Sequence, residues 1–166
     1  MSELLDFYRG VGTDAAGRTI EQIWAWDAKR LEMVHDYIQW LFPLPERSRF
    51  NPSAPLLTAA DIAAFRTDTD LQARALRSLD LMLRFYGLER GPHIGRSADF
   101  SAAAHWLQPL NHNHLRLTRI MLFLRHAALT AQADSLLSCL VDIAAKEGKA
   151  AIADRTLQFW RATKDA

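Results

Sequence analysis

Two segments carry the residues whose types and spacing could do chemistry. Residues 35–40 combine an imidazole, a carboxylate, an amide and an indole. Residues 111–120 contain a histidine followed by two arginines at intervals of four and three, which places all three on one face of a helix. Two arginines one turn apart can hold an anionic group through bidentate hydrogen bonds. The candidate ligand-binding residues are therefore His35, Asp36, Gln39, Trp40, His112, Arg116 and Arg119.

The two arginines have two interpretations. Apolar positions flank Arg116 and Arg119 on both sides of the expected helix, so both side chains should be partly buried. A buried guanidinium needs an anionic partner. That partner is either a carboxylate of the chain, with Asp36 or Glu32 as the candidates, or the carboxylate or phosphate of a ligand. We expect Arg116 to pair with Asp36.

Metal and cofactor chemistry find no support in the sequence. His112 and His114 are two residues apart, so on a helix their rings point about 200° apart and cannot share one ion. The chain has no metalloprotease helix motif, paired-cysteine motif, nucleophile elbow, phosphate-binding loop or dinucleotide fingerprint. We therefore expect no metal, no cofactor and no catalytic residues.

Composition limits the class of protein. The chain has 166 residues, 49% of them hydrophobic, which suits one domain with a real core. Its net charge of +1 argues against a nucleic-acid-binding surface. The single cysteine, Cys139, lies in an apolar helical pattern and reads as a core residue. We see neither a secretory signal nor a transmembrane segment, so we expect a cytoplasmic protein.

Periodicity and capping signals predict an all-α fold, a single compact orthogonal or antiparallel bundle of about seven to nine helices with no sheet. Thr19 and Thr58 each begin the spacing of a capping box. Four prolines mark residues 43–57 as a loop, and Gly91, Pro92 and Gly95 mark residues 88–99 as another. The expected helices span residues 2–9, a short stretch from 19, then 27–42, 58–67, 69–86, 101–107, 111–128, 134–147 and 150–163.

The expected helix 27–42 is the organising element. Its residues are apolar around most of the circumference, which predicts a buried helix. His35, Asp36 and Gln39 then form a polar strip, and buried polar groups must find partners. Either other elements supply those partners inside the core, or the strip is the wall of a pocket.

One run of residues resembles a known family. The segment Leu31-Glu-Met-Val-His-Asp-Tyr-Ile-Gln-Trp-Leu-Phe-Pro43 is similar to the signature of the opioid growth factor receptor conserved domain. Further similar elements follow in order, so the resemblance covers residues 7–140, and the helices of 134–163 would complete a single domain over 1–166. The supporting elements are residues 7–9, 51–57, 64–66, 85–87 and 111–120.

The resemblance implies a receptor-like protein. Eukaryotic members are described as receptors for an enkephalin-type pentapeptide, are nuclear or perinuclear, and carry long additional regions. A short, arginine-rich chain is typical of bacterial members, for which an opioid peptide is not an obvious ligand. The family supplies no catalytic residues.

We therefore predict a binding or receptor-type module for a small anionic or peptide ligand. Two alternatives stay open at this point. One is an enzyme that uses a His/Arg pocket on a phosphate- or carboxylate-bearing substrate. The other is a structural or protein-interaction domain with no small-molecule site.

Overall fold

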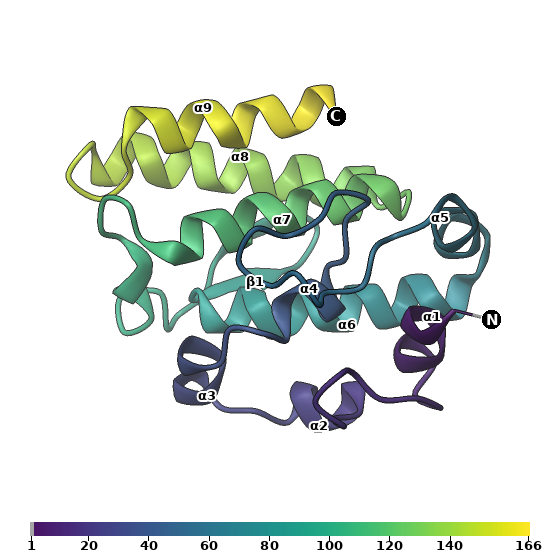
Figure 1. The fold of residues 1–166 in the computed structure, drawn as a ribbon. Coiled ribbons are helices and arrows are strands. Elements are labelled where there is room, and N and C mark those ends of the chain that lie inside the picture. The colour runs from purple at the N-terminus through teal and green to yellow at the C-terminus, as the bar shows by residue number, and fades with distance from the viewer. Residues whose placement is uncertain (1) are drawn as a thin grey trace. The chain divides into compact units, whose positions relative to one another are not determined.

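The computed structural model describes residues 2–166, which form nine α-helices, two 3-10 helices and one two-stranded sheet (Figure 1). None of these helices has the length and apolarity needed to cross a membrane. The α-helices are α1 (Glu3–Tyr8), α2 (Ile20–Trp24), α3 (Ala28–Met33), α4 (Ile38–Leu41), α5 (Ala59–Thr67), α6 (Thr69–Phe85), α7 (His112–His126), α8 (Thr130–Glu147) and α9 (Asp154–Ala162). The 3-10 helices are η1 (Ala104–Trp106) and η2 (Thr163–Asp165), and the strands are β1 (Leu88–Arg90) and β2 (Ile94–Arg96).

The chain divides into two compact units. Unit 1 holds the residues up to Leu81 together with 126–128, and unit 2 holds residues 82–125 and 129–166. Helix α6 begins in unit 1 and ends in unit 2.

Capping signals in the sequence are confirmed at four helix starts. Thr19 and Thr58 both form complete capping boxes, with Gln22 and Asp61 as their partners. The Asp27 side chain accepts a hydrogen bond from Arg30 N, and Ser2 caps α1. These side chains satisfy backbone N–H groups that have no acceptor within the helix.

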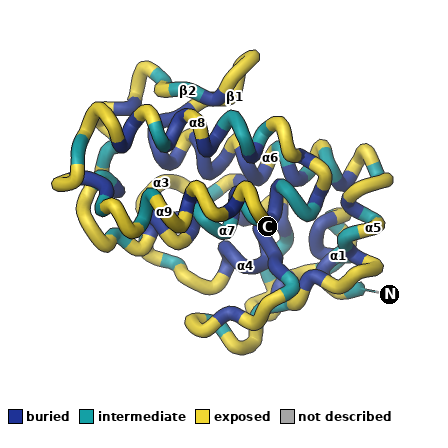
Figure 2. The backbone as a smooth tube through the Cα atoms, turned by 90° about the horizontal axis from the view of Figure 1, so that it is seen from above, coloured by how far each residue is buried: buried dark blue, intermediate teal, exposed yellow. Residues whose placement is uncertain are grey.

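The expected helix 27–42 is broken in the middle. Helix α3 ends at Met33, Val34 is extended with φ −90° and ψ 133°, and α4 begins at Ile38. The Tyr37 hydroxyl donates to the Leu31 carbonyl at 2.8 Å, so this buried carbonyl is satisfied without a continuing helix. As a result His35 and Asp36 are exposed, while α4 is buried along its length (Figure 2). The prediction of one buried helix over 27–42 is wrong in two respects: residues 34–37 are not helical, and α3 is helical but mostly exposed, with Leu31 as its buried residue.

The expectation of no sheet is also wrong. Residues 88–96, predicted as loop, form an antiparallel hairpin in which Glu89 pairs with Gly95. Each strand has only three residues, too few for an alternating pattern to be visible in sequence. The hairpin is completed by a distant partner, because Ile94 N donates to Ser135 Oγ of α8 at 2.8 Å.

A buried hydroxyl network holds unit 1 together. The Tyr8 hydroxyl of α1 donates to the Leu41 carbonyl at 2.6 Å, and lies 3.1 Å from Ser78 Oγ of α6. Trp24 Nε1 of α2 donates to the same Ser78 oxygen at 3.0 Å. Ser78 therefore accepts from Trp24 and donates to Tyr8, which ties α1, α2 and α6 to the end of α4. Burial raises the pKa of Tyr8, so its hydroxyl stays protonated and available as a donor.

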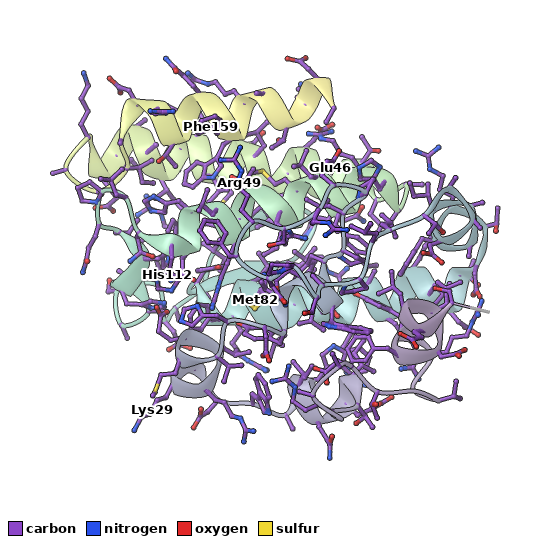
Figure 3. The ribbon with its side chains drawn as sticks, in the orientation of Figure 1. Lys29, Glu46, Arg49, Met82, His112 and Phe159 are labelled. Atoms are coloured by element: carbon purple, nitrogen blue, oxygen red, sulfur yellow. The ribbon has the colours of Figure 1, made fainter. Side chains whose placement is uncertain are left out.

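Unit 2 is a layered helical core with the hairpin against it. Helices α8 and α9 lie side by side (Figure 1), and β2 packs on α8 (Figure 2). The inner face of α8 carries fully buried Leu136, Leu140 and Ile143. Helix α9 contributes Trp160, which is also fully buried, whereas its neighbour Phe159 is 51% exposed (Figure 3).

The Tyr8 network predicts a stability effect. Replacing Tyr8 with Phe leaves the buried Leu41 carbonyl without its donor, so the free energy of unfolding should fall by about 1–3 kcal/mol. Chemical denaturation measures this directly. Thr13→Val, which removes a hydroxyl from an exposed residue, is the control and should change stability little. Equal stability of Tyr8→Phe and the parent chain would contradict this account of the network.

Candidate functional site

A pocket of about 220 Å³ lies within unit 1. Three separate stretches of chain build it: the loop before α2, the segment at α4, and the proline-containing loop after α4. A pocket of this size is smaller than a typical small-molecule site of roughly 300–1,000 Å³. It therefore suits one end of a ligand better than a whole ligand. Its lining residues are Ala15, Ala16, Arg18, Asp36, Trp40, Asn51 and Ser53.

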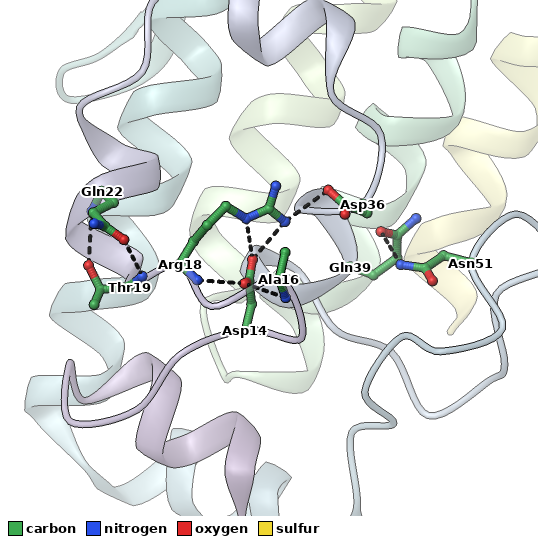
Figure 4. Close-up of polar contacts among 8 residues, drawn as sticks. All are labelled: Asp14, Ala16, Arg18, Thr19, Gln22, Asp36, Gln39 and Asn51. Carbon is green, nitrogen blue, oxygen red and sulfur yellow. Dashed lines mark hydrogen bonds and ion pairs between the residues drawn. The ribbon is translucent and has the colours of Figure 1, made fainter.

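Arg18 is the central charged residue of this pocket. Its Nε donates to Asp14 Oδ2 at 2.7 Å, and its Nη2 donates to Asp36 Oδ1 at 2.8 Å (Figure 4). The guanidinium also lies over the Trp26 ring, with 5.2 Å between Cζ and the ring centroid. Burial opposes the charge on Arg18, but the two carboxylates outweigh it and raise the pKa of the guanidinium.

Asp14 shapes the loop that carries Arg18. Its side chain is fully buried, and its Oδ1 accepts from the backbone N–H groups of Ala16 and Arg18 at 3.0 and 2.9 Å (Figure 4). Gly17 takes the left-handed conformation with φ 78°, which completes the tight turn. Asp14 therefore fixes both the backbone of this loop and the side chain of Arg18.

The other wall of the pocket is tied to α4 by an amide pair. Asn51 Nδ2 donates to Gln39 Oε1 at 3.4 Å, and Gln39 is only 5% exposed (Figure 4). Trp40 is similarly buried, and its ring packs edge-on against Phe7 with 5.2 Å between centroids. The pocket is therefore lined by a buried aromatic side chain as well as by polar ones.

The structure places the seven predicted site residues in two groups. In unit 1, Asp36 and Trp40 line the pocket, Gln39 supports it through Asn51, and His35 is exposed on the preceding coil. In unit 2, His112 is exposed at the start of α7 (Figure 3), Arg116 is buried and Arg119 is half-buried. Asp36 has Arg18 as an ion-pair partner. A pairing of Asp36 with Arg116, and a ligand contact by Arg116 or Arg119, stay predictions.

Sequence reasoning did not assign a site role to Arg18 and Asn51, which line the pocket, or to Asp14, which holds Arg18. All three lie in loops, where no helical periodicity groups them with other candidate residues. The one available signal was the four-residue spacing of Asp14 and Arg18 around Gly17, which suits a closed loop with its own ion pair. No pattern within the sequence pointed from Arg18 to Asp36.

The polar residues of the segment 111–114 have structural roles within unit 2. The Tyr86 hydroxyl donates to Asn113 Oδ1 at 3.2 Å, and Asn111 Oδ1 accepts from Asn113 N at the start of α7. His114 Nε2 lies 2.8 Å from the Trp106 carbonyl, so this nitrogen carries the proton. Trp160 Nε1 of α9 donates to the His114 carbonyl at 3.1 Å.

His114 is held as a neutral imidazole. It is 4% exposed and lies edge-on to the rings of Trp106 and Trp160. Its Nδ1 is buried and has no hydrogen-bond partner among residues 2–166. A proton on Nδ1 would be buried without an acceptor, and this burial lowers the pKa of His114.

Unit 2 contains a second, larger cavity of about 800 Å³, between β2 and α8. Its charged residues are paired with protein groups: Arg96 with Glu147, Lys146 with Asp142, and Asp134 with Arg125. Cys139 lies here and is buried, as predicted, and burial raises the pKa of its thiol to about 11. The thiol is therefore not a nucleophile at neutral pH. Residues 2–166 hold no group of three or more His, Cys, Asp or Glu side chains placed to bind a metal.

Comparison with known proteins identifies the family. The conserved region of the opioid growth factor receptor matches residues 5–163, nearly the whole chain. The chain belongs to the opioid growth factor receptor family. The match extends beyond residue 140, where the resemblance seen in the sequence stopped, and so includes α9. No solved structure matches the chain significantly.

Individual relatives agree with this membership. The opioid growth factor receptor of Rattus norvegicus is 38% identical over 125 residues, 70% of this chain and 21% of the relative. The Homo sapiens receptor is 39% identical over 106 residues, 61% of this chain and 16% of the relative. The opioid growth factor receptor-like protein 1 of Mus musculus is 34% identical over 111 residues, 63% of this chain and 24% of the relative. The chain thus spans less than a quarter of each of these family members.

The buried imidazole predicts a pH dependence of stability. The pKa of His114 is lower in the folded chain than its ordinary value of 6.5, so the unfolded chain binds the proton more readily. The stabilisation is complete above about pH 6.5 and is lost as pH falls toward the folded-state pKa. Denaturation at a series of pH values from 8 to 5 should show this loss, and a His93→Gln control, at an exposed histidine, should behave like the parent.

NMR titration of the His114 ring separates this histidine from His126, whose pKa burial also lowers. A His114 midpoint at or above that of an ordinary histidine would contradict the neutral, buried imidazole.

Proposed function

We propose that this chain is a ligand-binding module of the receptor type, and that the unit 1 pocket at Asp36 and Trp40 receives one end of a peptide or small ligand. The observation that supports this is the position of the family signature. Asp36 and Trp40 belong to the signature segment, and both line a pocket built from three separate stretches of chain. Relatives over 61–70% of the chain are named as receptors for an opioid growth factor.

The pocket is suited to selective binding because its polar groups are held before a ligand arrives. Arg18 is fixed by two carboxylates, and Asn51 is fixed by Gln39. Groups that are already ordered lose little conformational freedom when a ligand binds. Trp40 and the two alanines offer apolar surface for the adjoining part of the ligand.

The enzyme alternative has less support. It required His35 or His112 as an acid–base group beside an arginine. Both histidines are exposed, and neither lines the pocket. The interaction-domain alternative would be favoured by a broad exposed apolar patch or by a symmetric dimer.

A titration with peptides tests the proposal. We would add an enkephalin-type pentapeptide, and separately a set of unrelated pentapeptides, to ¹⁵N-labelled protein and follow the backbone amide signals. We expect at least one peptide to shift the signals of Ala16, Trp40 and Asn51 in a saturable way. Ser53→Trp, which places an indole at the exposed rim of the pocket, should weaken that binding about tenfold or more.

Ser101→Trp is the matched control, since Ser101 is an exposed serine outside the pocket. Its affinity should equal that of the parent chain. Binding that ignores Ser53→Trp, or that shifts only signals away from the pocket, would contradict the proposal. Arg119→Ala in the same titration tests the predicted contact between Arg119 and the ligand. An unchanged affinity of this variant would show that Arg119 does not contact the ligand.

A further inference from the structure

The unit 1 pocket contains an arginine, but the carboxylates around this arginine outnumber it. Among its lining residues Arg18 and Asp36 are charged, and Asp14 stands directly behind Arg18. One guanidinium thus lies between two carboxylates, so these three side chains together carry one net negative charge; Arg30 lies over the same Trp26 ring as Arg18 but does not line the pocket. Arg18 is only 17% exposed, and its Nε and Nη2 donate to these carboxylates. The charge of Arg18 is thus already balanced by these carboxylates before a ligand binds.

The negative charge that a ligand can reach is on Asp36. The Asp14 side chain is 0% exposed, whereas the Asp36 side chain is 55% exposed. The contact of Arg18 with Asp36 uses Oδ1, which leaves Oδ2 as an acceptor outside this ion pair. Asn51 adds a second acceptor, because its Nδ2 is used toward Gln39 and its Oδ1 is the remaining polar atom.

The rest of the lining fits the same ligand. A group with several N–H donors and a positive charge would match the two acceptors, and its apolar neighbour would lie against Trp40. Aromatic rings also attract cations electrostatically. The pocket volume of about 220 Å³ accommodates a terminal group with its first side chain rather than a whole peptide.

We propose that the unit 1 pocket binds the protonated amino terminus of a peptide, with Asp36 as the residue that selects for the positive charge and Arg18 as the residue that positions Asp36. This inference rests on the proposed function of the pocket, and it names the part of the ligand that enters. It replaces the expectation of an anionic ligand for this part of the chain.

Three forms of one tripeptide, Phe-Gly-Gly, test the charge. The first has a free amino end and an amidated carboxyl end, the second is blocked at both ends, and the third is acetylated with a free carboxylate. At pH 6.5 the free amino end is protonated, because its pKa is about 7.7–8.0. We expect the first form to bind about threefold to tenfold more tightly than the second, and the third to bind most weakly, as seen in the shifts of Ala16 and Asn51.

Asp36→Asn should bring the affinity of the first form down to that of the blocked form. Asp70→Asn, an equal change of charge at an exposed site outside the pocket, should leave the affinity unchanged. Equal binding of the first two forms at the pocket would overturn the charge selection while the pocket itself still binds peptide. Strongest binding of the third form, or an affinity unaffected by Asp36→Asn, would overturn it as well. If none of the forms shifts the pocket signals, both the inference and the assignment of the pocket fail.

Discussion

One guanidinium shared by two carboxylates is the interaction on which the signature region depends. Asp14 is fully buried, so its charge needs a partner, and Arg18 supplies it four residues along the chain. The same guanidinium then reaches Asp36, eighteen residues away, and holds the coil between α3 and α4 against the loop before α2. The two halves of this interaction differ in strength. The contact with buried Asp14 is costly to break, whereas a half-exposed contact such as that with Asp36 contributes only about 0–1 kcal/mol.

This difference would allow a structural ion pair to serve also in the ligand recognition that we propose. Asp14 secures Arg18, so Arg18 stays in place whether or not Asp36 also contacts a ligand. Asp36 is exposed enough to exchange water for a ligand and is still oriented by Arg18. Preorganisation of this kind lowers the conformational cost of binding. In unit 2 the polar residues 111–114 do the reverse. Asn113 and His114 are buried and bonded to Tyr86 and Trp106, so they stabilise the core of that unit.

Local signals were sufficient to predict most helices of the chain. The capping boxes at Thr19 and Thr58 and the amphipathic pattern of α6 each depend on residues within a few positions of one another. The failures depend on side-chain contacts that a helical pattern does not contain. The chain leaves the helical path at Val34 because Tyr37 satisfies the Leu31 carbonyl and Arg18 engages Asp36. The hairpin of β1 and β2 was missed because its strands are short and Ser135 of α8 completes it.

The sequence indicated some residues of the candidate site and not others, again because local patterns do not show distant contacts. The signature segment indicated Asp36 and Trp40, which do line a pocket. Sequence alone gave the wrong expectation for their surroundings, because a continuous helix would have buried Asp36. Asp14 and Arg18 act from a loop, and nothing in their local pattern points to the signature segment.

Backbone chemical shifts of residues 28–42 test most directly whether the signature segment leaves the helical path to present Asp36. The account predicts helical ¹³Cα shifts for 28–33 and again for 38–41, with an extended value at Val34 between them. An unbroken run of helical shifts from 28 to 42 would return Asp36 to the face of a continuous helix and would contradict the account.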